Sequence, residues 1–207
     1  MGIATGAKYL NRIQDDREVW LGGKRVDNVT THPALKRGAA SMASLLDRQH
    51  DKKLSDRLTY SEPASDERFA MSFLPPKSTT DVIRRGAAFY DWAKWSNGMM
   101  GRTPDFLNVS FMAMAAAGDY FGQNRPEFKK NIQDYYEHIR ENDLVLTHTL
   151  VNLQRSRAPV GTVIEDSTDI ALSVVKETDS GIVVNGARLL ATLPLSDEIA
   201  VYPARSH

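Results

Sequence analysis

The segment LSVVKETDSGIVV, residues 172–184, decides the fold class of this chain. Two runs rich in β-branched residues, 172–176 and 181–184, flank a short polar turn, which is the pattern of a β-hairpin. Residues 199–202 follow three polar residues and predict another short strand. The chain after about residue 145 is therefore predicted to form β structure.

Upstream of this region the apolar residues recur every three to four positions, which predicts helices. A small hairpin, residues 19–26 around Gly22-Gly23, is expected among them, because paired glycines suit a tight turn. Residues 55–76 hold three prolines among polar residues and are expected to be a loop. The helices are expected at Ala7–Gln14, from Pro33 toward His50, from Ser78 to Asn97-Gly98, from a Thr103 cap through a buried run 111–117, and from Pro126 through Ile139.

The pattern as a whole predicts an α+β chain with two parts. Residues 1–145 are expected to form a helical domain with a small hairpin, and residues 146–207 the first strands of a β domain. Only three or four strands fit into the second part, so its sheet is expected to have open edges.

The composition narrows the classes of partner and of chemistry. Lys plus Arg and Asp plus Glu number 26 each, so no net field attracts nucleic acid or an anionic membrane. The chain has no cysteine, which excludes disulfides, thiolate nucleophiles and cysteine-held metal clusters within it. No signal-peptide pattern or long apolar span is present, and a cytoplasmic protein without a bound metal is expected.

Four segments in order resemble the large, oxygenase component of the two-component 4-hydroxyphenylacetate 3-hydroxylase family. They are YLNRIQDDREVWLGGKRVDNVTTHPAL, MMGRTPDFLN, ENDLVLTHTLVNLQRSR and VVKETDSGIVVNGARLLATLPLSDEIAVYP. The resemblance implies an acyl-CoA-dehydrogenase-like fold: a helical N-terminal domain, a central β-barrel domain and a C-terminal helical bundle. The bundle has no counterpart here, and this chain stops within the β domain.

The resemblance also implies a reaction and its partners. In such enzymes a separate flavin reductase supplies FADH2, which forms a C4a-hydroperoxyflavin with dioxygen and hydroxylates a phenolic substrate. The protein excludes water and orients the ring. A homo-oligomer, or a complementing chain that carries the C-terminal half, is the expected assembly.

Two substrate residues are implied near the start of the predicted helix after Thr103. Arg102 matches the family's substrate-binding arginine, whose guanidinium favours negative charge on a phenol oxygen; read without the resemblance, it is a surface or interdomain arginine near a helix cap. Phe106 stands where hydroxyphenylacetate hydroxylases have a tyrosine, one helical turn after the arginine. Either the substrate differs or Phe106 is a core residue.

A third substrate residue and the flavin residues are implied further along. His148 matches the family histidine that contacts the substrate hydroxyl near the flavin, although a structural, hydrogen-bonded histidine is the alternative. The implied flavin contacts also include Thr149, Gln154, Arg157 and Thr192. Gln154 and Arg157 belong to a polar run that could be a solvated loop, and Thr192 could be an ordinary strand residue.

Two other functions compete with this hypothesis. The 4-hydroxybutyryl-CoA dehydratase branch of the same scaffold needs a cysteine-held iron–sulfur cluster, which a chain without cysteine cannot supply. A truncated, non-catalytic remnant or partner subunit that needs a second chain for flavin binding stays open. A companion polypeptide with the C-terminal half would decide between the remnant and the enzyme.

Overall fold

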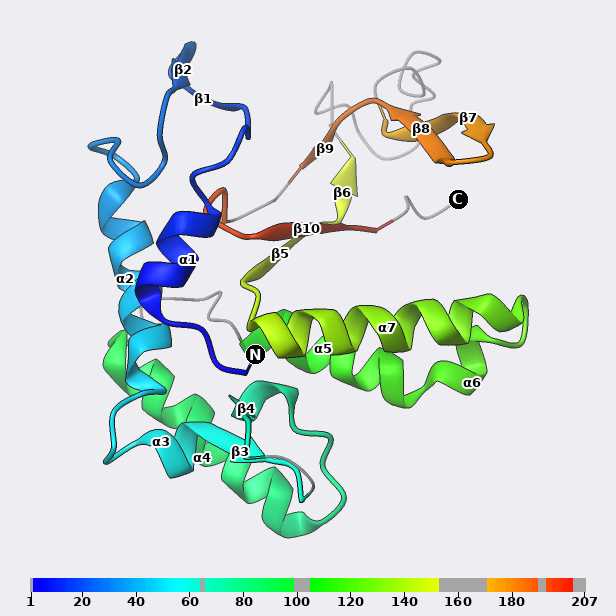
Figure 1. Ribbon diagram of the computed structural model, residues 1–207. Coiled ribbons are helices and arrows are strands. Elements are labelled where there is room, and N and C mark those ends of the chain that lie inside the picture. Colours follow the sequence, from blue (N-terminus) through cyan, green and yellow to red (C-terminus); the bar gives the residue numbers. More distant parts are fainter. Residues whose placement is uncertain (1, 64–65, 99–104, 153–170, 190–192, 203–207) are drawn as a thin grey trace, which may run out of the picture. The chain divides into compact units, whose positions relative to one another are not determined.

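The computed structural model describes residues 2–63, 66–98, 105–152, 171–189 and 193–202 (Figure 1). The chain divides into two compact units. The first unit contains Met1–Leu146 and Leu195–Glu198, and the second contains Thr147–Pro194 and Ile199–His207. The short segment Leu195–Glu198 thus returns to the first unit after the chain has left it.

The first unit begins with a capped helix and a hairpin, as the sequence predicts. Helix α1 (Gly6–Arg12) starts at Thr5, whose side chain accepts a hydrogen bond from the Lys8 N–H. Strands β1 (Val19–Leu21) and β2 (Lys24–Val26) pair antiparallel, and Gly22 and Gly23 both have positive φ angles between them.

Helix α2 (Lys36–Arg48) lies beside α1 and begins later than predicted. The expectation that Pro33 stands in its first turn is wrong. The Asn28 side chain accepts hydrogen bonds from the Thr30 N–H and hydroxyl, and the Asn28 carbonyl accepts from the His32 N–H. These bonds hold the chain in turns up to Leu35, so helical geometry starts only at Lys36.

Residues 55–76 are not the predicted loop. They form helix α3 (Ser55–Leu58), strands β3 (Thr59–Ser61) and β4 (Arg68–Ala70), and the 3₁₀ turn η1 (Met71–Phe73). The two strands pair antiparallel with Tyr60 opposite Phe69, and both rings are buried with centroids 5.7 Å apart. Three-residue strands are too short to show a period of two, and the prolines around them favoured a loop.

Helices α4 (Thr79–Trp95) and α7 (Pro126–Asn142) confirm the predicted start and stop residues. Ser78 caps α4, which ends before Asn97 and Gly98, both at positive φ. Pro126 opens α7, which packs against α5 (Asp105–Ala116) and α6 (Gly118–Phe121). The predicted Thr103 cap lies outside the described residues.

The expected burial of the whole run 111–117 is wrong. Met112 and Ala115 are buried, whereas Ala113, Ala116 and Ala117 are exposed, because α5 turns only one side toward the rest of the unit. The core of the first unit is built mainly from α1, α2, η1 and α7. Its most enclosed side chains include Tyr9, Ile13, Met42, Leu45, Leu46, Leu58, Met71, Phe73 and Ile139.

The predicted hairpin and the predicted strand near residue 199 are present, but the expectation of only three or four strands is wrong, because six strands lie after residue 145 in the described part of the chain, each paired with one other. The three strands that were not predicted have two to four residues each, too few to show a clear alternation. Strand β5 (Leu146–Thr149) pairs with β10 (Glu198–Val201), and β6 (Val151–Asn152) pairs antiparallel with β9 (Arg188–Leu189). The predicted hairpin forms β7 (Ser173–Thr178) and β8 (Gly181–Asn185), with a bulge between Val174 and Lys176.

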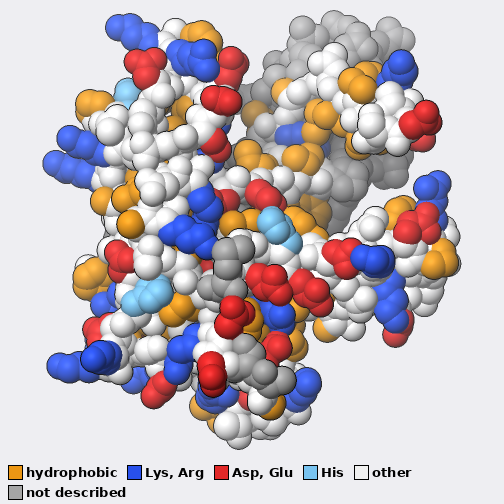
Figure 2. Space-filling model, in the orientation of Figure 1, with side chains coloured by type: hydrophobic (Ala, Val, Ile, Leu, Met, Phe, Trp, Pro, Cys, Tyr) orange, Lys and Arg blue, Asp and Glu red, His pale blue; other side chains and the backbone are white. Residues whose placement is uncertain are grey.

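Charge is evenly mixed on the face of the molecule that Figure 2 shows. Acidic and basic side chains alternate over the first unit there, in line with the equal totals in the sequence. In the described part of the chain, no helix has both the length and the apolar character needed to cross a membrane.

Candidate functional site

A buried carboxylate sets the point at which α7 ends and the chain turns into β5. Asp143 has the left-handed φ of 49°, and its Oδ2 accepts hydrogen bonds from the Ala4 N–H at 3.0 Å and from Gln49 Nε2 at 2.7 Å. Burial raises the pKa of the Asp143 carboxyl, although these donors act in the opposite direction. The turn is therefore fixed by contacts to α2 and to the N-terminal segment.

A salt bridge next to this turn holds the residues that directly precede β5 and β10. Arg12 donates to both carboxylate oxygens of Asp197, at 2.7 and 2.8 Å. Asp197 Oδ2 also accepts from the Val145 N–H at 2.8 Å, and the Asp197 N–H donates to the Val145 carbonyl at 2.7 Å. The side chain of Asp197 is only 6% exposed, so this is a largely desolvated pair.

Strand β5 carries polar side chains into a buried position. All four of its residues are buried, and His148 is 3% exposed. The Thr149 hydroxyl donates to the Leu189 carbonyl on β9 at 2.5 Å. The buried Thr147 hydroxyl has no hydrogen-bond partner in the described part of the chain. Since buried hydroxyls are normally satisfied, Thr147 fits a site that a polar ligand completes.

Tyr202 packs against His148. Their ring centroids are 6.4 Å apart and the ring planes meet at 89°, which is the edge-to-face arrangement that aromatic pairs prefer. The Tyr202 N–H donates to the Thr149 carbonyl at 3.2 Å, and burial raises the pKa of the Tyr202 phenol.

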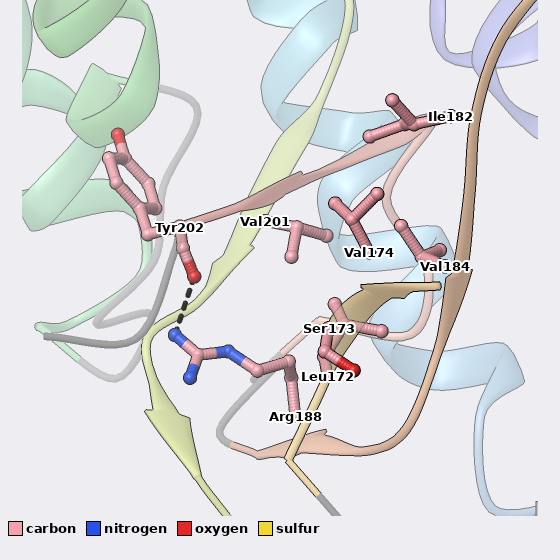
Figure 3. A pocket seen from close by; sticks show the side chains of 8 residues that line it. All are labelled: Leu172, Ser173, Val174, Ile182, Val184, Arg188, Val201 and Tyr202. Carbon is pink, nitrogen blue, oxygen red and sulfur yellow. Dashed lines mark hydrogen bonds between the residues drawn. The ribbon is translucent and has the colours of Figure 1, made fainter. Parts of the chain in front are cut away.

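Arg188 on β9 ties two strand ends together. Its Nη2 donates to the Tyr202 carbonyl at 2.5 Å and to the Leu150 carbonyl at 3.0 Å. Leu150 and Tyr202 directly follow β5 and β10 in the chain. Figure 3 shows the bond from Arg188 to Tyr202.

A mostly apolar pocket of about 300 Å³ adjoins this group of residues (Figure 3). Val174, Val184 and Val201 face one another across it. The cationic Arg188 side chain also lines the pocket, whereas the Tyr202 ring points away from the three valines (Figure 3). An apolar hollow with one cationic group suits a mainly apolar ligand. The lining comprises Leu172, Ser173, Val174, Ile182, Val184, Arg188, Val201 and Tyr202.

The structure describes three of the residues that the sequence proposes for the site. His148 and Thr149 lie together on buried β5, in the second unit. Phe106 lies on α5 in the first unit, and 47% of its side chain is exposed, so it is not a core residue. Arg102, Gln154, Arg157 and Thr192 lie outside the described residues.

Sequence reasoning missed Tyr202 and Arg188 as members of the site. Tyr202 was predicted only as part of a strand, and Arg188 was not singled out. Both act here through backbone contacts or ring packing, which leave no spacing pattern in a sequence. Within the described ranges, no three His, Asp or Glu side chains come together as metal ligands would.

The polar strand and its pocket have the chemistry that a flavin would need. A flavin ring offers several hydrogen-bonding atoms on an otherwise apolar plane, and the unpartnered Thr147 hydroxyl on buried β5 is a group that could meet one of them. The described residues therefore fit one wall of a flavin site.

Residues 5–207 match the family model described as "4-hydroxyphenylacetate 3-hydroxylase N terminal". The 4-hydroxyphenylacetate 3-monooxygenase oxygenase component of Thermus thermophilus is 44% identical over 203 residues, which cover 97% of this chain and 40% of that protein. The chain thus spans about two fifths of the length of the relatives it matches.

Solved structures show the same likeness. The oxygenase component of 4-hydroxyphenylacetate 3-monooxygenase complexed with FAD and 4-hydroxyphenylacetate superposes with a TM-score of 0.87 at 43% identity, over 97% of this chain and 41% of that one. An archaeal 4-hydroxybutyryl-CoA dehydratase from N. maritimus reaches 0.71 at 14% identity, over 90% and 37%, which shows a shared fold alone. The predicted α+β, acyl-CoA-dehydrogenase-like fold is confirmed.

Proposed function

Because the chain belongs to the 4-hydroxyphenylacetate 3-hydroxylase family, we propose that it is the N-terminal part of a reduced-flavin-dependent monooxygenase that hydroxylates a phenolic ring. The observation that carries the proposal is the likeness of nearly the whole chain to an oxygenase component crystallised with FAD and 4-hydroxyphenylacetate. The buried polar strand β5 supports it, because it offers the chemistry that such a site needs.

His148 and Arg102 are the proposed substrate residues. Burial of His148 at 3% exposure supports this role, because a water-free imidazole can hold or accept the phenol proton without competition from solvent. Arg102 adds positive charge for the phenolate that develops as the ring reacts. Phe106, half exposed on α5, offers an aromatic surface without a hydroxyl donor.

The cofactor of the proposed reaction is FAD in its reduced form, held with the help of His148, Thr149, Gln154, Arg157 and Thr192. When bound, reduced FAD would supply the two electrons that activate dioxygen, so that one oxygen atom of dioxygen reaches the ring and the other leaves as water. The residues of this chain orient the phenol, exclude water and manage its proton. A separate flavin reductase delivers the reduced FAD, and the working assembly is a homo-oligomer or includes a complementing chain.

A test uses the complete protein that contains this chain, supplied with chemically reduced FAD, dioxygen and a panel of phenols. We expect a hydroxylated product from at least one of hydroxyphenylacetate, tyrosine derivatives or chlorophenols. No product across the panel would refute the proposal.

Substitution then tests the two residues. His148→Ala and Arg102→Ala should each slow oxygen transfer by about 10²-fold while the melting temperature and FAD binding change little. His138→Ala is the matched control, because His138 is 53% exposed beside Glu198 on the surface. A loss of activity in proportion to a loss of stability would instead assign His148 a structural role.

A second candidate function is a subunit that requires another polypeptide to hold FAD. The observation that favours it is the β7–β8 hairpin, whose Val174, Val175, Ile182, Val183 and Val184 are each 47–63% exposed. Such an apolar hairpin tends to pair with another chain. On gel filtration, the 207-residue chain alone should lose FAD and elute above 23.1 kDa. A monomer that retains FAD and forms product would contradict this candidate.

A further inference from the structure

One guanidinium on β9 is hydrogen-bonded to two backbone carbonyls close to His148 in the chain or in space. Arg188 Nη2 donates to the carbonyls of Leu150 and Tyr202, at 3.0 and 2.5 Å. These carbonyls belong to the residues that follow β5 and β10, which pair with each other. A charged donor shared by two carbonyls ties both strand ends more firmly than a neutral group would.

Tyr202 connects the Arg188 hydrogen bonds to His148. The Tyr202 backbone is held on two sides, by Arg188 at its carbonyl and by the Thr149 carbonyl at its N–H. From this backbone position the Tyr202 ring lies at 89° to the imidazole, with centroids 6.4 Å apart. A ring in edge-to-face contact limits the rotation of its neighbour, because other angles lose the favourable arrangement.

We propose that Arg188 is a positioning residue for His148, and that it acts through the backbone and ring of Tyr202. The structural part of this inference is independent of the proposed function, and its effect on turnover rests on that function. An imidazole has two chemically distinct nitrogens, and a proton moves well only when the correct one meets the substrate within hydrogen-bond reach. Fixing the plane of the ring therefore fixes which nitrogen is presented.

The first experiment observes the His148 ring directly in the 207-residue chain without flavin. The ring resonances of His148 are followed by NMR and assigned by their loss in His148→Gln, since the chain has five histidines. In Arg188→Met we expect these resonances to shift and broaden, because the ring samples more than one orientation. Arg188→Lys should restore them, because an ammonium can donate to both carbonyls.

Two further variants separate the contact from general damage. Tyr202→Leu removes the ring but leaves the Arg188 tie to backbone carbonyls, and it should broaden the same His148 resonances, an effect that the loss of the tyrosine ring current alone does not cause. Arg84→Met is the matched control, since Arg84 lies on α4 with only a 3.9 Å contact to Asp81, and the His148 spectrum should not change. If Arg188→Met does not fold, Tyr202→Leu and Arg188→Lys still decide the question.

The second experiment measures turnover in the complete protein. Arg188→Met should lower kcat by about tenfold and Arg188→Lys should recover most of it. In a His148→Ala background, Arg188→Met should cause little further loss, because a residue that acts through His148 has nothing left to position.

The outcomes distinguish this inference from the proposed function. Unchanged His148 resonances in Arg188→Met and Tyr202→Leu would overturn the positioning role, whatever the melting temperature does. Full additivity of Arg188→Met and His148→Ala would overturn it as well. Altered resonances in a protein that hydroxylates no phenol would refute the proposed function and leave the positioning of His148 intact.

Discussion

Arg12 and Asp197, which are 185 positions apart in the sequence, form a bidentate salt bridge with N–O distances of 2.7 and 2.8 Å. Arg12 also donates to the carbonyls of Asn142 and Asp143, at 3.0 and 3.2 Å. A single side chain on α1 therefore holds the end of α7 and the segment before β10.

We predict that Arg12→Met lowers the free energy of unfolding by about 3–5 kcal/mol, because it leaves a buried carboxylate without its cation. Arg12→Lys should also destabilise, though less, because an ammonium cannot reproduce the planar pair of donors. Urea titration of the 207-residue chain measures both. Arg25→Met is the control: its 3.9 Å pair with Glu18 is exposed, and about 0.5 kcal/mol or less should be lost. Equal losses at Arg12 and Arg25 would contradict the prediction.

Asp143 should make stability depend on pH. Because burial raises its pKa in the folded chain above the value of about 3.9 in the unfolded chain, the folded state binds its proton more tightly. The stability that Asp143 contributes is therefore fully present below about pH 4 and is lost as the pH rises through the folded pKa. Asp143→Asn cannot ionise, and asparagine also tolerates the left-handed backbone at this position.

The measurement is the difference in unfolding free energy between Asp143→Asn and the unchanged chain, determined at several pH values. This difference should grow in favour of Asn as the pH rises above about 4 and then level off. Other titrating groups cancel in the difference. A difference that stays constant with pH would show that Asp143 keeps its ordinary pKa.

Two glycines should respond to alanine in opposite directions. A Cβ at Gly6 would lie 2.6 Å from both the Ala43 carbonyl oxygen and Asp47 Oδ2, where α1 meets α2. A Cβ at Gly86, in the middle of α4, would meet no described atom within 4 Å. Gly86→Ala should therefore stabilise the chain by about 0.5–1 kcal/mol, and Gly6→Ala should destabilise it by about 1–3 kcal/mol. Thermal melts of the two variants test the contrast, which a shift of the same sign in both would exclude.

Phe106→Tyr should change substrate recognition rather than folding. The side chain is 47% exposed, so an added hydroxyl meets little steric resistance on α5. If Phe106 lies at the substrate, as proposed, the new donor should lower the KM for hydroxyphenylacetate by about 2- to 10-fold, the value of one hydrogen bond. Phe128→Tyr makes the same change on α7, at 39% exposure, and should leave KM unaltered. Equal KM values for all three proteins would remove Phe106 from the substrate site.

Elements whose ends carry turn, capping or helix-starting residues were predictable from the sequence. The Gly22-Gly23 turn, the Ser78 cap and Pro126 each mark an element that the structure contains. Residues 55–76 were not predictable, because their strands have three residues each and depend on the burial of Tyr60 and Phe69 within the first unit. Short elements stabilised by distant contacts have no local signature.

The candidate site was predictable in part for the same reason. His148 was identified from a motif, and its burial on a polar strand agrees with a site, although its role stays a prediction. Arg188 is tied to the site by hydrogen bonds to the carbonyls of Leu150 and Tyr202. Any residue can supply a carbonyl, so no choice of amino acid reveals such a contact in advance.

The return of Leu195–Glu198 to the first unit has a consequence for biosynthesis. Tyr9 and Arg12 leave the ribosome well before their partners Leu195 and Asp197, which follow 186 and 185 residues later. At a synthesis rate of about 5–20 residues per second, roughly 10 to 40 s pass between the synthesis of helix α1 and that of its partners. During that interval the helical unit lacks the hydrogen bonds of Tyr9 and Arg12 to the segment Leu195–Glu198. The unit is then more open to chaperones and proteases.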